Sequence, residues 1–390
     1  MVISISGLTG KRFLVSLFFL FLAGMVFGYD MDIVPPKFKS DIPGIDLNNE
    51  VKNYFKNFRK DLKNELDNFL PESVDKLAGG FANASIFTSD AASQRGYEGY
   101  NAFSITVGPM IAFQFPQDSI KDILSIFYNE GVTELVKYIL DIPFGFDVQI
   151  SAQFGINTSK FLLEGLYLGF KFIKFDTNWI KDMPSEFSFS TMSIGVNASY
   201  QLIRQKRLLA GLLVWRGLNL GTGFIWQNTS LGLTTALPIP EELATVKIPT
   251  IPAIGDINMP LNPNFHLDFE TKTYIVPMEA MTSIRLAGFF NLALGAGVDV
   301  AFGGSSINIS GSFNVDEDKI DQQLRPLGIT MEEAPKLELR LGGMSRPSIF
   351  NVKIMGAVGF NFGPVLIDIP VTYYLFSNGY SIGLTFGVTL

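Results

Sequence analysis

Large apolar residues alternate with small or weakly polar ones from Tyr380 to Leu390. Successive side chains of a β-strand point to opposite faces, so this pattern predicts a strand with one apolar face and one small, polar face. Similar alternation recurs upstream. We predict ten strands, at 103–115, 144–156, 161–176, 186–202, 208–228, 266–286, 291–315, 349–361, 365–377 and 380–390.

The polar faces of these strands are rich in Gly, Ser, Asn and Gln, and they also carry Asp299, Lys353 and Asp368. A soluble sandwich would place Lys and Glu on such faces, whereas the lumen of a membrane barrel takes small polar side chains and a few charges. We therefore predict an all-β fold, a transmembrane antiparallel β-barrel of about 10–14 strands over residues 102–390.

The predicted connections alternate between short turns and long loops, as they do in barrels with short periplasmic turns and longer outer loops. Three long loops have a distinct character. Residues 117–139 have apolar residues at helical spacing, 236–263 contain six prolines that favour an extended path, and 316–334 are acidic.

An N-terminal segment, 29–101, precedes the barrel and is expected to be periplasmic or lumenal. Within it, residues 47–70 repeat apolar side chains at helical spacing, including Val51, Phe55 and Leu62, and Pro71 ends the pattern. We predict an amphipathic helix that plugs the lumen or caps the periplasmic mouth; simple packing and a membrane surface are the alternatives. Residues 81–87 fit either a short strand or part of a plug.

Residues 1–28 have the features of a cleaved secretory signal peptide. Lys11 and Arg12 precede an apolar run from Phe13 to Phe27, and Gly28 follows it. No other stretch is long and apolar enough to predict a transmembrane helix. The chain lacks Cys, so a lipoprotein anchor is excluded.

The composition adds two constraints. Hydrophobic residues make up 47% of the chain, including 36 Phe, so much apolar surface has to enter a core or face lipid. The net charge is −7, and no basic patch favours nucleic acid as a partner.

Candidate chemistry is sparse. His266, Asp268 and Glu270 lie on one face of a predicted strand and are the only plausible metal or acid–base group, but a solvated strand end explains them better. The glycines near Phe302 do not form a phosphate-binding loop, because no helix follows them. We expect no enzyme activity, no catalytic or metal residues and no cofactor, and the substrate-binding residues stay unknown.

The chain resembles two groups of proteins. Its final strand resembles the C-terminal signal of Gram-negative outer-membrane barrels, although the last residue is Leu390 rather than the usual Phe. A helical segment before the barrel and apolar outer-loop helices resemble the long-chain fatty-acid transporter (FadL-type) family. That family has an N-terminal hatch with an Asn-Pro-Ala segment. The most similar segment of this chain, Phe81 to Ser85, lacks the proline.

Together these features predict an outer-membrane channel or transporter, with small or hydrophobic solutes as the substrate class that the resemblance implies. The alternatives are a secreted or periplasmic all-β lipid-binding protein and a structural or adhesive barrel without transport. The expected partners are outer-membrane lipid and, through the C-terminal strand, the barrel-assembly machinery.

Overall fold

The computed structural model describes residues 30–40, 48–49, 51–53, 55–57, 59–60, 74–93, 102–115, 145–159, 162–179, 186–209, 212–235, 245–248, 257–315, 322, 324 and 329–390. The predicted signal peptide, the apolar loop at 117–139 and most of the acidic loop lie outside these residues. Among the described residues no helix is long and apolar enough to cross a membrane.

The N-terminal part contains β1 (Asp30–Val34), β2 (Lys37–Ser40) and α3 (Val74–Phe87). The strands that follow are β3 (Phe103–Gln114), β4 (Gly145–Asn157), β5 (Leu166–Asp176), β6 (Phe187–Ile203), β7 (Lys206–Leu208), β8 (Leu213–Thr235), β9 (Thr245–Ile248), β10 (Ile257–Leu286) and β11 (Phe290–Val315). The chain ends with β12 (Ile329–Glu333), β13 (Lys336–Ser345), β14 (Phe350–Phe362), β15 (Val365–Tyr374), β16 (Gly379–Gly383) and β17 (Thr385–Thr389). One short 3-10 turn, η1 (Thr177–Trp179), follows β5.

Ten antiparallel strands close into a ring, as the sequence predicts. The tenth is an interrupted strand, β16 and β17, which pairs with both β15 and β3. The strand is interrupted at Leu384, which lies opposite Pro109. Proline has no backbone N–H and cannot donate a hydrogen bond to the neighbouring strand. The Leu384 N–H donates to the Pro109 carbonyl at 3.0 Å, so the seam stays bonded across the break.

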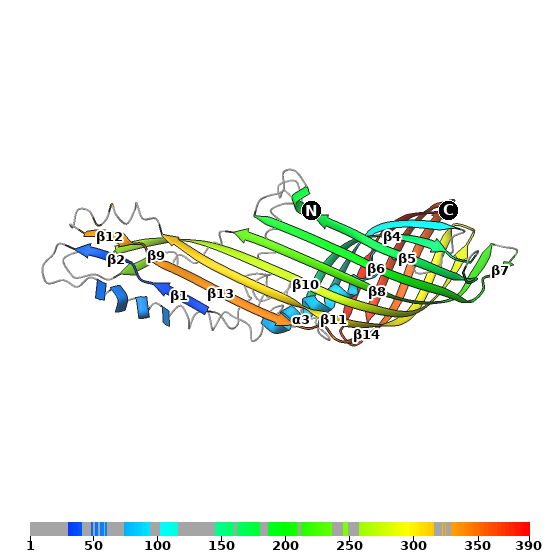
Figure 1. Ribbon diagram of the computed structural model, residues 1–390, viewed down its shortest axis with the longest axis horizontal. Helices are drawn as coiled ribbons and strands as arrows, with labels where there is room; N and C mark the ends of the chain where they lie inside the picture. The colour runs from blue at the N-terminus through cyan, green and yellow to red at the C-terminus, as the bar shows by residue number, and fades with distance from the viewer. Residues whose placement is uncertain are drawn as a thin grey trace, which may run out of the picture.

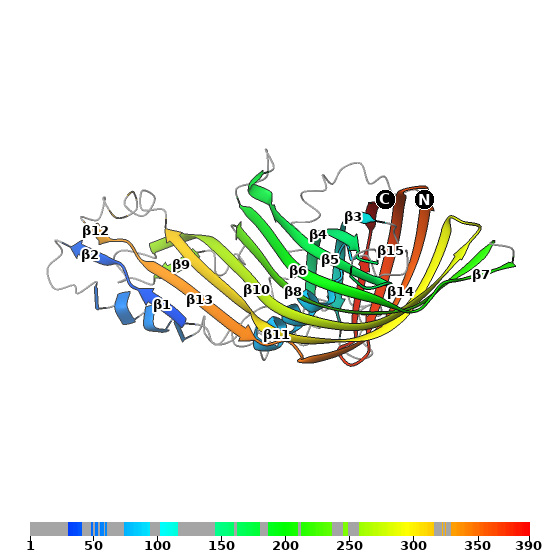
Figure 2. The same ribbon diagram turned by 45° about the vertical axis from the view of Figure 1, so that its right-hand side comes forward.

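The two ends of the ring differ. At one end lie Phe103, Leu390, the connections at 287–289 and 363–364, and the described parts of the connections at 158–165 and 204–212; we call it the short-turn end. At the other end β8, β10 and β11 continue far past the ring, and β13 and β1 join them at the edge of the sheet. Figures 1 and 2 show this part as an elongated arm, which we call the extension.

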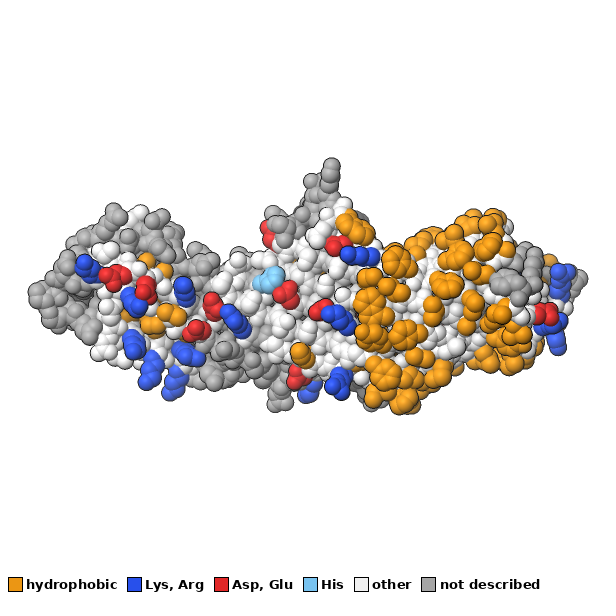
Figure 3. All heavy atoms as spheres, in the orientation of Figure 1, with side chains coloured by type: hydrophobic (Ala, Val, Ile, Leu, Met, Phe, Trp, Pro, Cys, Tyr) orange, Lys and Arg blue, Asp and Glu red, His pale blue; other side chains and the backbone are white. Residues whose placement is uncertain are grey.

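The outer wall of the ring carries a continuous apolar band (Figure 3). Outward side chains such as Ile105, Phe172 and Leu294 are 60–63% exposed, whereas inward neighbours such as Gln149 and Thr372 are at most 1% exposed. Proteins in water rarely expose apolar patches of this extent, and polar groups inside with apolar groups outside are typical of a barrel in lipid.

The band ends at one register row, in which Ile194, Trp226, Tyr274 and Phe302 lie side by side on β6, β8, β10 and β11. Beyond this boundary row the outward residues of β10 are Lys272, Glu270, Asp268 and His266. The inward residues change in the opposite sense, to buried apolar side chains: Leu267 and Phe269 on β10, and Ile307 and Ile309 on β11. The same strands thus pass from an apolar exterior to an aqueous one.

Two predicted strands are therefore too short. The ranges 208–228 and 266–286 are exceeded because β8 reaches Thr235 and β10 begins at Ile257, within the predicted proline-rich loop, whereas the predicted strand 291–315 agrees with β11. In the ring the apolar residues of the alternation face outward, whereas in the extension they face inward. A further strand, β13, contains residues 337–341 and lies outside the ring.

The helix predicted at 47–70 is not confirmed as a plug. Its described residues, within 48–60, are helical and lie in the extension near β1 and β2 (Figure 1). The Asn48 side chain accepts from the Phe38 N–H and donates to the Phe38 carbonyl, both at 2.8 Å, while Val51 and Phe55 are buried. The apolar stripe is covered there, away from the lumen.

We expect the band to face lipid, and one strand offers a matched test. Leu294 and Ser310 both point outward from β11, on either side of the boundary row. Leu294→Arg should lower the free energy of unfolding by about 2–4 kcal/mol in a bilayer, and Ser310→Arg by no more than about 0.5 kcal/mol. Urea titration in lipid vesicles measures both. Equal, small effects would mean that the band faces water.

Candidate functional site

Residues 74–93 fill the lumen of the ring, and we call them the plug. The plug consists of α3 and the turn at 88–93, and almost every residue from Leu77 to Ala92 is buried. Its sequence is rich in Ala, Gly and Ser, which gives a slim helix that fits a narrow barrel. Asp75, in the first turn, suits the positive end of the helix dipole and accepts from the Met344 N–H of β13 at 3.0 Å.

Glycines in the wall make room for the plug. A Cβ added to Gly145 of β4 would lie 1.9 Å from the Gly80 carbonyl oxygen, and one added to Gly379 would lie 2.1 Å from the Phe87 ring. The Phe87 ring also stacks on Tyr374 of β15, with centroids 4.0 Å apart. The plug therefore packs closely against wall residues that are far apart in the sequence, on β4, β15 and β16.

Side-chain hydrogen bonds hold the plug to strands around the ring. Ser85 Oγ lies 3.0 Å from Thr273 Oγ1, and the Gln227 amide donates to the Ser85 carbonyl. Further bonds run from Thr88 Oγ1 to Asp147 Oδ2 (2.5 Å), from Lys171 Nζ to the Ser89 carbonyl (2.5 Å), and from Thr106 Oγ1 to the Ala92 carbonyl (2.6 Å). The contacts come from β3, β4, β5, β8 and β10.

A buried charge cluster ties the turn of the plug to the far wall. Lys353 Nζ of β14 lies 3.1 Å from Asp90 Oδ2, 2.5 Å from Glu279 Oε1 and 2.8 Å from Asp299 Oδ1. The Tyr374 hydroxyl donates to Asp299 at 3.2 Å. Lys353 is fully buried, so its ammonium depends on these carboxylates in place of water. Only Asp90 comes from the plug.

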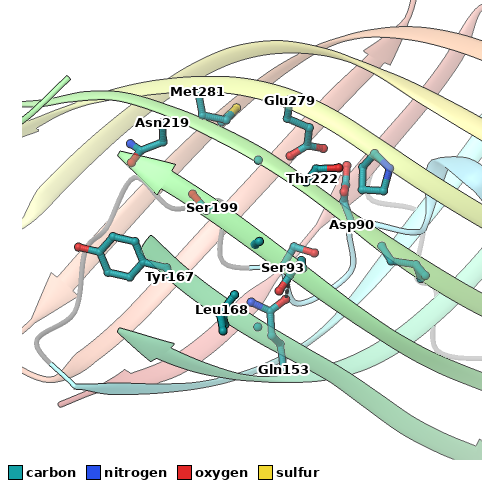
Figure 4. A pocket seen from close by; sticks show the side chains of 16 residues that line it. Asp90, Ser93, Gln153, Tyr167, Leu168, Ser199, Asn219, Thr222, Glu279 and Met281 are labelled. Carbon is teal, nitrogen blue, oxygen red and sulfur yellow. Dashed lines mark hydrogen bonds between the residues drawn. The ribbon is translucent and has the colours of Figure 1, made fainter. Parts of the chain in front are cut away.

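A small cavity lies beside the plug, with a volume of about 50 Å³. Figure 4 shows its lining, which includes Asp90 and Ser93 of the plug and Gln153 and Asn219 of the wall. The Asn219 side chain is 2% exposed, and neither of its amide atoms has a protein partner. The space is large enough to admit a few water molecules.

The residues singled out from the sequence fall in two places. His266, Asp268 and Glu270 lie on the outer face of the extension: His266 contacts Thr234 and Asp268, and Glu270 pairs with Lys272. Within the described residues no group of three or more His, Asp or Glu side chains could hold a metal ion. Asp299 and Lys353, predicted for the lumen face, meet in the charge cluster.

The sequence did not predict the pairing of Asp90 with Lys353. Residues 81–87 were considered as part of a plug, and their small side chains were the available signal. Asp90 follows them in a stretch without periodicity. Its partner lies 263 residues away, and only ring closure brings the two together.

The charge cluster predicts unequal effects of two substitutions. Lys353→Met leaves three buried carboxylates without their cation, and should lower the free energy of unfolding by about 3–5 kcal/mol. Asp90→Asn should cost much less, because Lys353 keeps Glu279 and Asp299. Urea unfolding in detergent, followed by tryptophan fluorescence, measures both. A larger loss for Asp90→Asn would contradict this account of the cluster.

The chain has low similarity to several solved structures. It is 10% identical to the CymD monoaromatic hydrocarbon channel, with a TM-score of 0.24, covering 82% of this chain and 98% of that one. It is also 10% identical to the transport unit of the autotransporter AIDA-I from Escherichia coli, with a TM-score of 0.27, covering 81% of this chain and 99% of that one. It is 9% identical to a Pseudomonas aeruginosa FadL homologue, with a TM-score of 0.25, covering 80% of this chain and 96% of that one.

Comparison with curated proteins finds no match. The family model described as Lsa36-like matches residues 41–390, a range that takes in the plug, the ring and most of the extension. The chain belongs to the Lsa36-like family.

Proposed function

We propose that this protein is an outer-membrane β-barrel channel that the plug holds closed, and that it passes small or hydrophobic solutes when the plug moves. The observation that carries the proposal is a closed ring, apolar outside, whose polar lumen is filled by a separate segment of the chain. The proposed partners are membrane lipid and the barrel-assembly machinery, and no catalytic role is proposed.

The mode of attachment supports a plug that can move. The N–H groups of Thr88, Ser89, Ala91 and Ser93 donate to carbonyls within the plug itself. The bonds given above between plug and wall use side chains, which water can replace one by one. The ring strands pair with one another without the plug, so its displacement leaves the wall bonded.

The outer-membrane location rests on the strands. A barrel is the β-structure that leaves no unpaired edge in lipid, and the C-terminal strand completes the ring. Export would require the signal peptide predicted at 1–28.

Two truncations separate the plug from the rest of the N-terminal segment. A mature chain lacking 30–73 keeps α3 and loses β1, β2 and the helix beside them; one lacking 30–93 loses the plug as well. In planar bilayers we expect low conductance from the first and clearly raised conductance from the second. The same low conductance from both, with folded barrels, would exclude the plug as the barrier.

A disulfide lock tests the same idea in the full chain. Ser85 and Thr273 are adjacent, and the native chain has no Cys, so Ser85→Cys with Thr273→Cys offers a single pairing. Any openings of the native channel should disappear in the oxidised form and return on reduction. Openings that persist in the oxidised form would show that this end of the plug does not move.

A second candidate function is a barrel without transport that anchors the extension at the cell surface. The residual cavity of about 50 Å³ favours it, as does the length of β10 and β11 beyond the boundary row. Absence of conductance in both truncations would support it. The alternative of a soluble lipid-binding protein would require something to shield the apolar band from water.

Short turns lie in the periplasm in outer-membrane barrels, so both candidates place the extension, with β1 and β2, at the cell surface and not in the periplasm expected for this part of residues 29–101. The plug runs from the extension through the lumen, so β1 lies at the end opposite the short turns. In intact cells Asp32→Cys and Asn308→Cys should react with an impermeant maleimide, and Arg207→Cys, at the short-turn end, only after permeabilisation. The reverse pattern would place the extension in the periplasm.

A further inference from the structure

A cleft of about 480 Å³ opens on the outer surface beside the boundary row. It forms because β11 changes partners: β13 ends opposite Ser305, and β14 begins opposite Val300. The stretch between them includes Gly303 and Gly304, which have no side chains to fill the gap. Gly303 has φ +119°, and a Cβ there would lie 2.0 Å from the Lys272 carbonyl oxygen.

The cleft has one excess positive charge. Lys272 and Arg346 line it, together with a single acid, Glu270, which lies 2.7 Å from Lys272 Nζ. Within the described part of the chain Arg346 has neither an ion pair nor a side-chain hydrogen bond. Its guanidinium is therefore exposed at the edge of the cleft and available to an oxyanion.

Apolar side chains adjoin the cleft on the side of the band. Phe302 is 54% exposed, Phe350 65% and Tyr274 43%, and all three point outward. Figure 3 shows charged side chains directly beside the edge of the band. A cationic cleft at this level, next to exposed aromatic rings, complements a molecule with an anionic head and an apolar tail.

We propose that this cleft binds the phosphorylated headgroup of a lipid in the leaflet that faces the extension. Lys272 and Arg346 contact the phosphate oxygens, and the acyl chain lies against Phe302 and Phe350. A free phosphate can make the same contacts with Lys272 and Arg346, but it has no acyl chain to pack against the aromatic rings. The inference rests on the proposed membrane barrel but requires neither transport nor plug movement.

Lipid retention by the full mature chain tests the proposal. Purified protein is incubated in detergent with equal amounts of phosphatidic acid and phosphatidylcholine, repurified, and analysed by mass spectrometry. The variant is Lys272→Gln with Arg346→Gln. The matched control is Lys206→Gln with Arg207→Gln, which removes two exposed cations at the short-turn end.

Wild type and control should retain more phosphatidic acid than phosphatidylcholine. In the cleft variant the ratio of the two retained lipids should fall about tenfold. Glu270→Gln should increase the preference, an effect that a purely structural role would not produce. An unchanged preference in the cleft variant would overturn the proposal. So would displacement of the lipid by an equal concentration of inorganic phosphate, which would indicate a site for a soluble anion.

The outcomes also separate this proposal from the proposed function. If the barrel does not face lipid, Leu294→Arg is tolerated and neither lipid is retained. If only the cleft is misassigned, Leu294→Arg remains destabilising while wild type and the cleft variant retain the two lipids alike.

Discussion

Complete backbone pairing around the ring is the constraint on which this structure depends. A strand that faces lipid has no water to satisfy its N–H and carbonyl groups, so an open edge is excluded and the ring has to close. The last strand of the chain performs the closure by pairing with β3 on one side and β15 on the other. The Leu384 N–H keeps the seam bonded at the point where Pro109 lacks a donor.

Closure creates an interior with an opposite requirement. The inward side chains are polar, and several are charged, so each needs a partner or water. The plug supplies many of these partners, among them Thr88 for Asp147 and Asp90 for Lys353. The plug occupies the space that side chains at Gly145 and Gly379 would fill. The wall and the plug are therefore complementary in shape as well as in polarity.

The longest strands pass through two surroundings, and their sequence changes with each. On β10 the outward face changes from Tyr274 to Lys272 within one strand repeat, and the inward face turns to Leu267 and Phe269 beyond it. The ring of Phe269 contacts Phe81 of α3, with centroids 4.5 Å apart, so the apolar interior of the extension continues onto the plug. A single helix thus packs against a water-excluding core at one end and a polar lumen at the other.

The positions and outward faces of the ring strands follow from the sequence, because period-two alternation is a local signal, whereas the sequence left the number of strands between about ten and fourteen. Local patterns also placed Asp299 and Lys353 on the lumen face. They did not reveal which segment fills the lumen. The strongly amphipathic residues near 47–60 were the obvious choice, yet they pack in the extension, while the weakly patterned α3 enters the barrel. The tertiary structure decided this, because a narrow polar lumen selects for slim, hydrogen-bonding side chains rather than for an apolar stripe. The continuation of β8 and β10 was missed for a related reason. Alternation shows which side chains face which surroundings, and beyond the boundary row the inner face is apolar and the outer face polar.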